Sequence, residues 1–247
     1  MENYFSNGAF DNSEIEKAII TIAGATLEAA KEGMRIAKSD KGVQFIFSLL
    51  TQIVSSSSND NWYDEMKNLG ININNKSQYF DLSCESQKLV DQYLFHNNLG
   101  SDLSEMAQSA MGDALSSVVK SETVNLFKSD NDLQSRFNKN TEQENFVCIS
   151  KSFFSGFLNR YLNFFLSRIS VDTNRGKMIR NLQDNRDFNK SLKIHCDQTS
   201  YIVEDFSRGW YGKTRYKNKI DKPDTTGFVA TALDKLKNEM IMQGKGK

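Results

Sequence analysis

The chain has 247 residues, and its 31 basic and 31 acidic side chains give a formal net charge of zero. Hydrophobic residues make up 38 % and charged residues 25 %, the mixture of an ordinary soluble globular protein with one large or two small domains. The opening MENYFSNGAF lacks the basic and then apolar run of a secretory signal, so a secreted protein is not expected.

The N-terminal part is expected to be helical. Ser13 and Glu16 form a Ser-x-x-Glu capping box, which predicts a helix start, and apolar residues then recur at helical spacing to about Lys38. A second apolar segment, 43–54, is also predicted to be a helix from its length and spacing. The serine-rich residues 55–60 are predicted to form a loop or hinge.

The segment from residue 62 onward alternates short predicted helices with polar segments. Residues 62–69 and 84–97 are predicted to be helices, and 70–77 to be irregular or one short strand. A further helix is predicted over 99–126, where small residues in the middle would permit a close approach by another helix. Residues 128–145 are predicted to be a polar connection.

One stretch is apolar over more than half of a helix circumference. Residues 146–169 read FVCISKSFFSGFLNRYLNFFLSRI, and Thr141 and Glu144 before them form a Thr-x-x-Glu capping box. Charged residues such as Arg160 argue against a membrane span. A helix of this kind must be covered from several sides, so the sequence predicts an all-α multi-helix bundle around a central apolar helix at about 143–169.

The C-terminal part is basic and then helical. Short helical pieces are predicted at 178–182 and 188–192, and 199–211 begins as helix or strand. An irregular basic segment, 206–222, is expected before a final helix over 227–242. Proline occurs once in the chain, and this scarcity fits a helical protein because proline interrupts helix interiors.

Charge is distributed unevenly along the chain. Residues 1–150 carry 12 basic and 21 acidic side chains, whereas 151–222 carry 15 basic and 7 acidic ones. The predicted organisation is an acidic helical part, 1–140, and a part with the central helix, basic segment and last helix, 141–247, within one compact unit. The two charged parts either face each other in the fold or present surfaces to different partners.

The basic segment interleaves cations with aromatic rings. Cations neutralise phosphates and aromatic faces stack on bases, so this combination is typical of a nucleic-acid or partner-binding surface. The alternative is a solvated loop whose rings anchor it to the core. The candidate binding residues are Arg208, Trp210, Tyr211, Lys213, Arg215, Tyr216, Lys217 and Lys219.

No cofactor or metal site is expected. The cysteines, Cys84, Cys148 and Cys196, are far apart, and with His96 and His195 they give no recognised zinc spacing. The simplest interpretation is that the cysteines are reduced, buried thiols. His195 and Cys196 are adjacent in sequence, but neighbouring residues generally point apart, which disfavours thiol catalysis.

Catalytic motifs are missing from the sequence. It contains no GxxxxGK[ST], GxGxxG or GxSxG pattern, which disfavours nucleotide-driven and serine-hydrolase activities. The remaining enzyme hypothesis is a metal-dependent nuclease in which Glu204 and Asp205 act with Lys213. Such sites usually lie on adjacent strands, and no convincing sheet is predicted.

The sequence therefore predicts a non-enzymatic helical adaptor or interaction subunit with a protein partner or self-association. Abundant Asn, Ser and Lys indicate a bacterial, cytoplasmic protein without a membrane span. Accessory subunits of bacterial multi-protein complexes, antiviral defence systems among them, often have this size and helical character. The alternative hypothesis is a nucleic-acid-binding protein that uses segment 206–222, followed by the metal-dependent nuclease.

Overall fold

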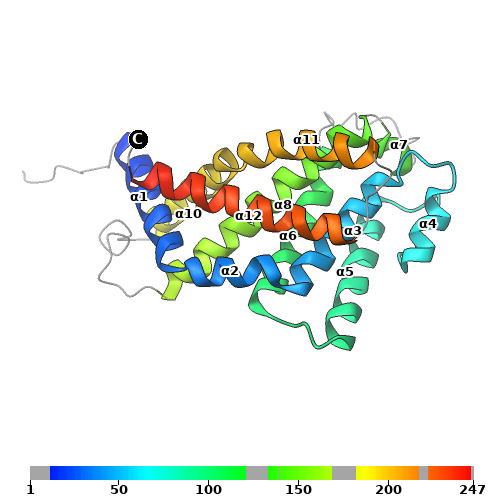
Figure 1. Ribbon diagram of the computed structural model, residues 1–247, viewed down its shortest axis with the longest axis horizontal. Helices are drawn as coiled ribbons and strands as arrows, with labels where there is room; N and C mark the ends of the chain where they lie inside the picture. Colours follow the sequence, from blue (N-terminus) through cyan, green and yellow to red (C-terminus); the bar gives the residue numbers. More distant parts are fainter. Residues whose placement is uncertain (1–11, 121–132, 139, 169–181, 217–221, 246–247) are drawn as a thin grey trace, which may run out of the picture.

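All regular secondary structure in the described part of the chain is α-helical, which confirms the predicted all-α, multi-helix fold. The computed structural model describes residues 12–120, 133–138, 140–168, 182–216 and 222–245 (Figure 1). The helices are α1 (Asn12–Ala29), α2 (Lys31–Ser39), α3 (Lys41–Ser55), α4 (Trp62–Leu69), α5 (Tyr79–His96), α6 (Asp102–Lys120), α7 (Leu133–Phe137), α8 (Glu142–Arg168), α10 (Leu182–Thr199), α11 (Tyr201–Tyr216) and α12 (Lys222–Gly244).

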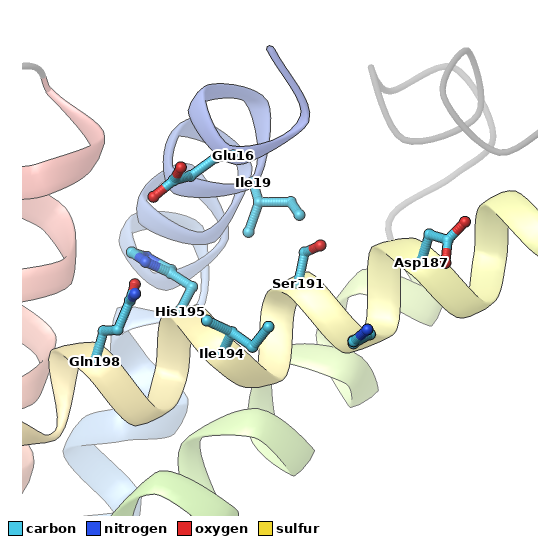
Figure 2. A pocket seen from close by; sticks show the side chains of 8 residues that line it. Glu16, Ile19, Asp187, Ser191, Ile194, His195 and Gln198 are labelled. Atoms are coloured by element: carbon cyan, nitrogen blue, oxygen red, sulfur yellow. The ribbon is translucent and has the colours of Figure 1, made fainter. Parts of the chain in front are cut away.

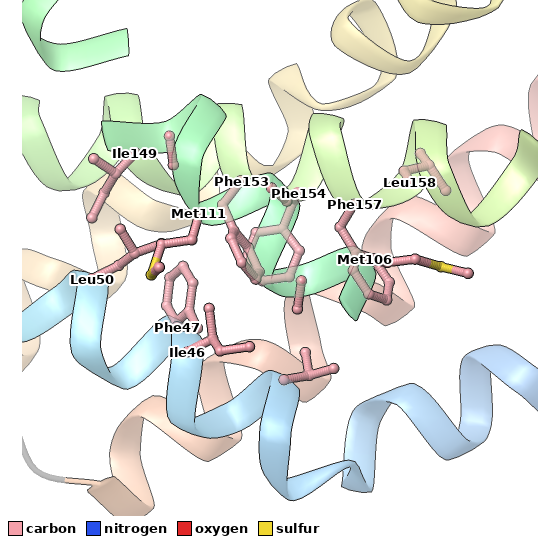
Figure 3. Packing of buried hydrophobic residues seen from close by; sticks show 14 of the residues in the cluster. Ile46, Phe47, Leu50, Met106, Met111, Ile149, Phe153, Phe154, Phe157 and Leu158 are labelled. Atoms are coloured by element: carbon pink, nitrogen blue, oxygen red, sulfur yellow. The ribbon is translucent and has the colours of Figure 1, made fainter. Parts of the chain in front are cut away.

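The long helix α8 contacts several other helices. Thr141 caps it by accepting a hydrogen bond from the backbone N–H of Glu144 at 3.2 Å, as the sequence predicted. Along its length α8 packs against α6 most extensively, and also against α11, α10, α3 and α1. Figure 3 shows Phe153, Phe154 and Phe157 of α8 packed against residues of α3 and α6. These three phenylalanines are fully buried, so they contribute strongly to stability.

The pairing of α6 with α8 depends on small residues. Ala107, Ala110 and Ala114 of α6 are fully buried, as expected from the small side chains in the middle of that helix. A Cβ atom added to Gly156 of α8 would lie 3.4 Å from the Cβ of Ala110, so little space separates the helices. At the edge of this contact Arg160 donates a hydrogen bond to Asp113 at 2.7 Å.

The first predicted helix is divided in two at Ala30. Its backbone dihedrals (φ −94°, ψ 18°) leave the helical region, so α1 ends at Ala29 and α2 begins at Lys31. The hydroxyl of Tyr161 on α8 donates a 2.6 Å hydrogen bond to the carbonyl of Ala30. No proline or glycine marks this break, which explains why the local sequence predicted one helix. The side chain of Ser13, the expected cap, lies outside the described residues.

The two ends of the described chain meet where α1 crosses α12. Figure 1 shows α12 beside α1 and α2, and its C-terminal end reaches α1. A Cβ atom added to Gly24 would lie only 3.0 Å from the Cα of Gly244 and 3.1 Å from the carbonyl oxygen of Met240. Lys245 also approaches Glu28 at 3.4 Å. The close approach of the two backbones therefore favours glycine at both positions.

The predicted irregular basic segment is wrong for residues 206–216, which form the C-terminal part of α11. Val203, Ser207, Tyr211 and Thr214 make a buried stripe at spacings of three and four residues. Two of these residues are polar, so the apolar periodicity that reveals a helix is absent. Residues 217–221 of the segment lie outside the described part.

Other boundaries also differ from the sequence expectations. α5 begins at Tyr79 rather than near residue 84, and the Gln78–Asp81 capping box marks that start. Within the predicted polar connection 128–145, α7 forms because Leu133 and Phe137 are buried on one side. α10 is continuous through the piece predicted at 188–192, whereas most of the piece at 178–182 lies outside the described residues.

Candidate functional site

Arg208 lies on α11 beside the start of α8 and is paired with acidic residues. Its guanidinium contacts the carboxylate of Glu144 through Nη1 and approaches Glu204 at 3.6 Å through Nη2. The arginine remains about half exposed, so these pairs add little stability. A phosphate that approached Arg208 would have to compete with two carboxylates.

Trp210 is half-buried and Tyr211 is buried, so neither ring forms an open stacking surface. The ring of Trp210 lies 5.3 Å from Phe146 and 4.9 Å from Phe228, measured between centroids. Tyr211 is only 3 % exposed, and its hydroxyl donates to Glu142 at 3.0 Å. These contacts match the anchoring role that was the alternative to base stacking.

The remaining candidate residues lie toward the end of α11. Lys213 is exposed, and Arg215 and Tyr216 belong to the last turn, although their side chains are not among those described. Lys217 and Lys219 lie outside the described residues. The nucleic-acid hypothesis therefore remains a prediction that depends on cations from Lys213 onward.

Lys151 of α8 is surrounded by groups from α10 and α11. Its Nζ lies 3.4 Å from the ring centroid of Tyr201 and 3.9 Å from both Asp197 and Glu204. Glu204, one of the two acidic residues of the nuclease hypothesis, thus contacts both Lys151 and Arg208. Among the described residues, no three His, Cys, Asp or Glu side chains gather closely enough to hold a metal ion.

The cysteines have three different environments. Cys196 is fully buried, and burial raises the pKa of its thiol far above the usual range, which makes it unreactive. Cys148 is half-buried and donates to the Ser117 hydroxyl at 3.3 Å, whereas Cys84 is exposed on α5. The prediction of three buried thiols is therefore wrong for Cys84, which faces solvent because α5 covers the core with its opposite side.

A further candidate surface is the outer face of α5, defined here by the exposed residues Phe80, Cys84, Lys88, Gln92 and Phe95. Their spacing of four, four, four and three residues places them on one side of the helix. Phe80 is 72 % exposed and Phe95 is 81 % exposed. Large aromatic side chains are enriched in protein interfaces, so two of them on one exposed stripe indicate a contact surface.

The opposite face of α5 is anchored to the core. Leu82, Val90 and Leu94 are buried there, and α5 packs along α6. The ring of Tyr93 stacks on Phe45 of α3. The outer face was not predicted because the expected helix begins after Phe80. The Gln78–Asp81 capping box is the local signal that extends the helix to include this residue.

Comparison with known protein families, curated proteins and solved structures gives no match. Within the described residues, no helix combines the length and apolar character that crossing a lipid bilayer requires.

Proposed function

We propose that this chain is a non-enzymatic helical interaction subunit that binds a protein partner through the outer face of α5. The observation that carries this proposal is the exposure of Phe80 and Phe95 on a helix whose other side is fixed to the core. Leaving two phenylalanine rings in water loses the free energy that their burial would provide. A partner that covers both rings would recover it.

The geometry of the face fits a partner that lies along α5. Phe80 and Phe95 are fifteen residues apart, which corresponds to about 22 Å along a helix. Lys88 and Gln92, between the rings, would supply polar contacts. Aromatic anchors with polar residues around them resemble the arrangement of energetically dominant residues in protein interfaces.

A bacterial origin and membership of a multi-protein complex are part of the same proposal. Composition supports a bacterial protein, and a helical chain without catalytic motifs suits an accessory subunit of a multi-protein complex, antiviral defence complexes included. In self-association, the partner on this face is a second copy of the chain. A measurement of the oligomeric state distinguishes this case from binding to a different protein.

The test replaces both rings with charges. We expect Phe80→Asp/Phe95→Asp to abolish co-purification of a defined partner from the native host, or the dimer seen by light scattering, because each buried aromatic anchor contributes about 2 kcal/mol or more. The matched control is Met242→Asp, which changes a half-exposed residue on α12. The Met242→Asp variant should still co-purify with the partner or form the dimer.

Two results would contradict the proposal. One is that the same proteins co-purify with wild type and with the double variant. Circular dichroism must show that both proteins are folded. The other is that the wild-type protein is a monodisperse monomer and captures no more protein from its native host than the double variant does.

A further inference from the structure

Negative charge surrounds the two exposed rings on the outer face of α5. Asp81 follows Phe80 directly, Asp91 precedes Phe95 by one helical turn, and both aspartates are exposed. On the neighbouring helix α6, Glu105 is a further exposed carboxylate. The two rings therefore lie in an acidic surface, although the whole chain has a formal net charge of zero.

Neutral groups satisfy the two aspartates and leave their charges uncompensated. The Asp81 carboxylate accepts a hydrogen bond from the backbone N–H of Gln78 at 2.7 Å. Asp91 accepts from a glutamine side chain of α6, also at 2.7 Å. Lys88, the one lysine of α5, is paired instead with Glu85 at 3.6 Å. Within the described residues, neither aspartate forms an ion pair, so a basic partner would meet two carboxylates with unbalanced charge.

A polar pocket of about 330 Å³ adjoins the Phe80 end of the outer face. The loop before α5 and the first turns of the helix line it, and Asp81, Cys84 and Glu85 are among the lining residues. Two carboxylates thus face the single ammonium group of Lys76 in this lining. A lysine or arginine side chain from a partner suits this pocket better than an acidic one, because the carboxylates outnumber the ammonium group.

The helical backbone of α5 favours a helical partner. Backbone groups in the middle of a helix are bonded within that helix, so the outer face offers only side chains. An extended strand laid along it would find no backbone groups with which to pair. A second helix satisfies its own backbone groups and packs its side chains against those of α5. A helix of about fifteen residues spans the distance of about 22 Å between Phe80 and Phe95.

We propose that the partner of the outer face is a basic amphipathic helix, an inference that rests on the function proposed above. Apolar residues on one side of the partner cover Phe80 and Phe95, and its lysine or arginine residues pair with Asp81 and Asp91. One basic side chain enters the pocket beside Asp81 and Glu85. A second copy of the chain fits less well, because it would bring the same carboxylates against this face.

The test uses two synthetic helical peptides of about eighteen residues that share one leucine face. One peptide has lysine and the other glutamate at the remaining positions, and each is titrated into the full chain by fluorescence anisotropy. We expect the lysine peptide to bind at least about ten-fold more tightly at about 50 mM salt, and the difference to shrink at about 500 mM because salt screens exposed charges. Phe80→Ala/Phe95→Ala leaves the charge unchanged and should weaken the lysine peptide at both salt concentrations.

Charge variants locate the binding site on the outer face. Asp81→Asn/Asp91→Asn should weaken the lysine peptide about five-fold, the effect of two exposed ion pairs. The matched control, Asp187→Asn/Asp205→Asn, removes two exposed carboxylates from α10 and α11 and should leave the affinity unchanged. Lys88→Glu adds negative charge and should tighten the lysine peptide about two- to five-fold, a gain that partial unfolding cannot produce.

The inference is overturned if the glutamate peptide binds as tightly as the lysine peptide, or if neither peptide binds. It is also overturned if Phe80→Ala/Phe95→Ala has no effect, or if the control variant weakens binding as much as Asp81→Asn/Asp91→Asn. A dimer of the chain that Phe80→Asp/Phe95→Asp abolishes would overturn the basic partner and leave the proposed function standing. Loss of the proposed function would appear instead as unchanged co-purification in that same aspartate variant.

Discussion

Two buried polar side chains, Tyr161 and His195, differ in whether the protein satisfies their hydrogen-bonding groups. The Tyr161 hydroxyl donates to the carbonyl of Ala30 and thereby joins α8 to the junction of α1 and α2. His195 lines the pocket between α1 and α10 (Figure 2), but its Nε2 atom is buried without a hydrogen-bond partner among the described residues. An unpaired buried polar atom costs about 1–3 kcal/mol, so the first residue stabilises the fold while the second reduces its stability.

The depressed pKa of His195 predicts how stability depends on pH. Burial favours the neutral imidazole, so the folded pKa lies below the ordinary value of 6.5 that the unfolded chain should show. As pH falls through about 6.5, the unfolded state binds a proton that the folded state resists. We expect the free energy of unfolding, measured by urea denaturation, to be constant above pH 7.5 and to decrease as pH falls below 6.5 toward the folded pKa.

His195→Leu should remove this contribution, so its stability should depend less on pH than that of wild type over the same range. His96→Leu, on the exposed end of α5, is the matched control because it removes the other imidazole of the chain. Parallel pH profiles for wild type and His195→Leu would mean that the imidazole is protonated with equal ease in the folded and unfolded states.

At the scale of elements, the prediction was most accurate where local signals were strong. α4 matches the predicted 62–69: Trp62 is buried at its start, and Gly70, with φ +94°, ends it. α8 starts within one residue of its prediction because its apolar residues and cap are both local. The break at Ala30 depends on Tyr161, more than a hundred residues away in sequence, and no local pattern could reveal it.

The candidate surfaces were harder to predict than the helices. Arg208, Trp210 and Tyr211 are close together in the sequence, but the sequence alone could not show that Glu144 contacts Arg208 and that Glu142 contacts Tyr211. The pocket between α1 and α10 joins residues far apart in the chain and has no motif. Composition carries no information about which side of a helix another segment will cover.

The crossing of α1 and α12 gives a prediction about the packing of elements. Gly24→Val would place side-chain atoms against the backbone of Gly244, which can move only if the helices separate. We expect a loss of about 1–3 kcal/mol in urea denaturation, the cost of overpacking. The matched control is Gly209→Val in α11, where an added Cβ would have no neighbour within 4 Å. That variant should change stability by less than about 0.5 kcal/mol, and equal losses would contradict the close approach.

At the scale of the whole molecule, the acidic and basic parts of the chain partly neutralise each other. Arg160 and Arg208, from the basic stretch 151–222, contact Asp113 and Glu144, from the acidic stretch 1–150. Some of the positive charge that suggested a nucleic-acid partner is therefore paired within the protein. In segment 206–222, Lys213 and the cations after it remain the candidates for phosphate contacts in the nucleic-acid alternative.

This arrangement predicts weak interaction with nucleic acids. We expect short single- and double-stranded DNA and RNA not to bind measurably above about 50 mM salt, because Arg160 and Arg208 are already paired with carboxylates and are less able to contact phosphates. The measurement is fluorescence anisotropy across a salt series, with Lys213→Glu/Arg215→Glu/Lys217→Glu beside wild type. Tight binding with a steep salt dependence, lost in the triple variant, would instead establish the nucleic-acid alternative.

The contact between α1 and α12 also bears on how the chain folds during its synthesis. Glu28 and Lys245, which meet at this crossing, are 217 residues apart, and ribosomes add about 5–20 residues per second. α1 would therefore leave the ribosome roughly ten to forty seconds before its partner helix exists. During that interval Ile19, Ala23 and Leu27, which are buried in the finished protein, lack the cover of helices that are synthesised later, α8, α10 and α12 among them. The nascent N-terminal helix should thus be a preferred client of chaperones that bind exposed apolar segments on the ribosome.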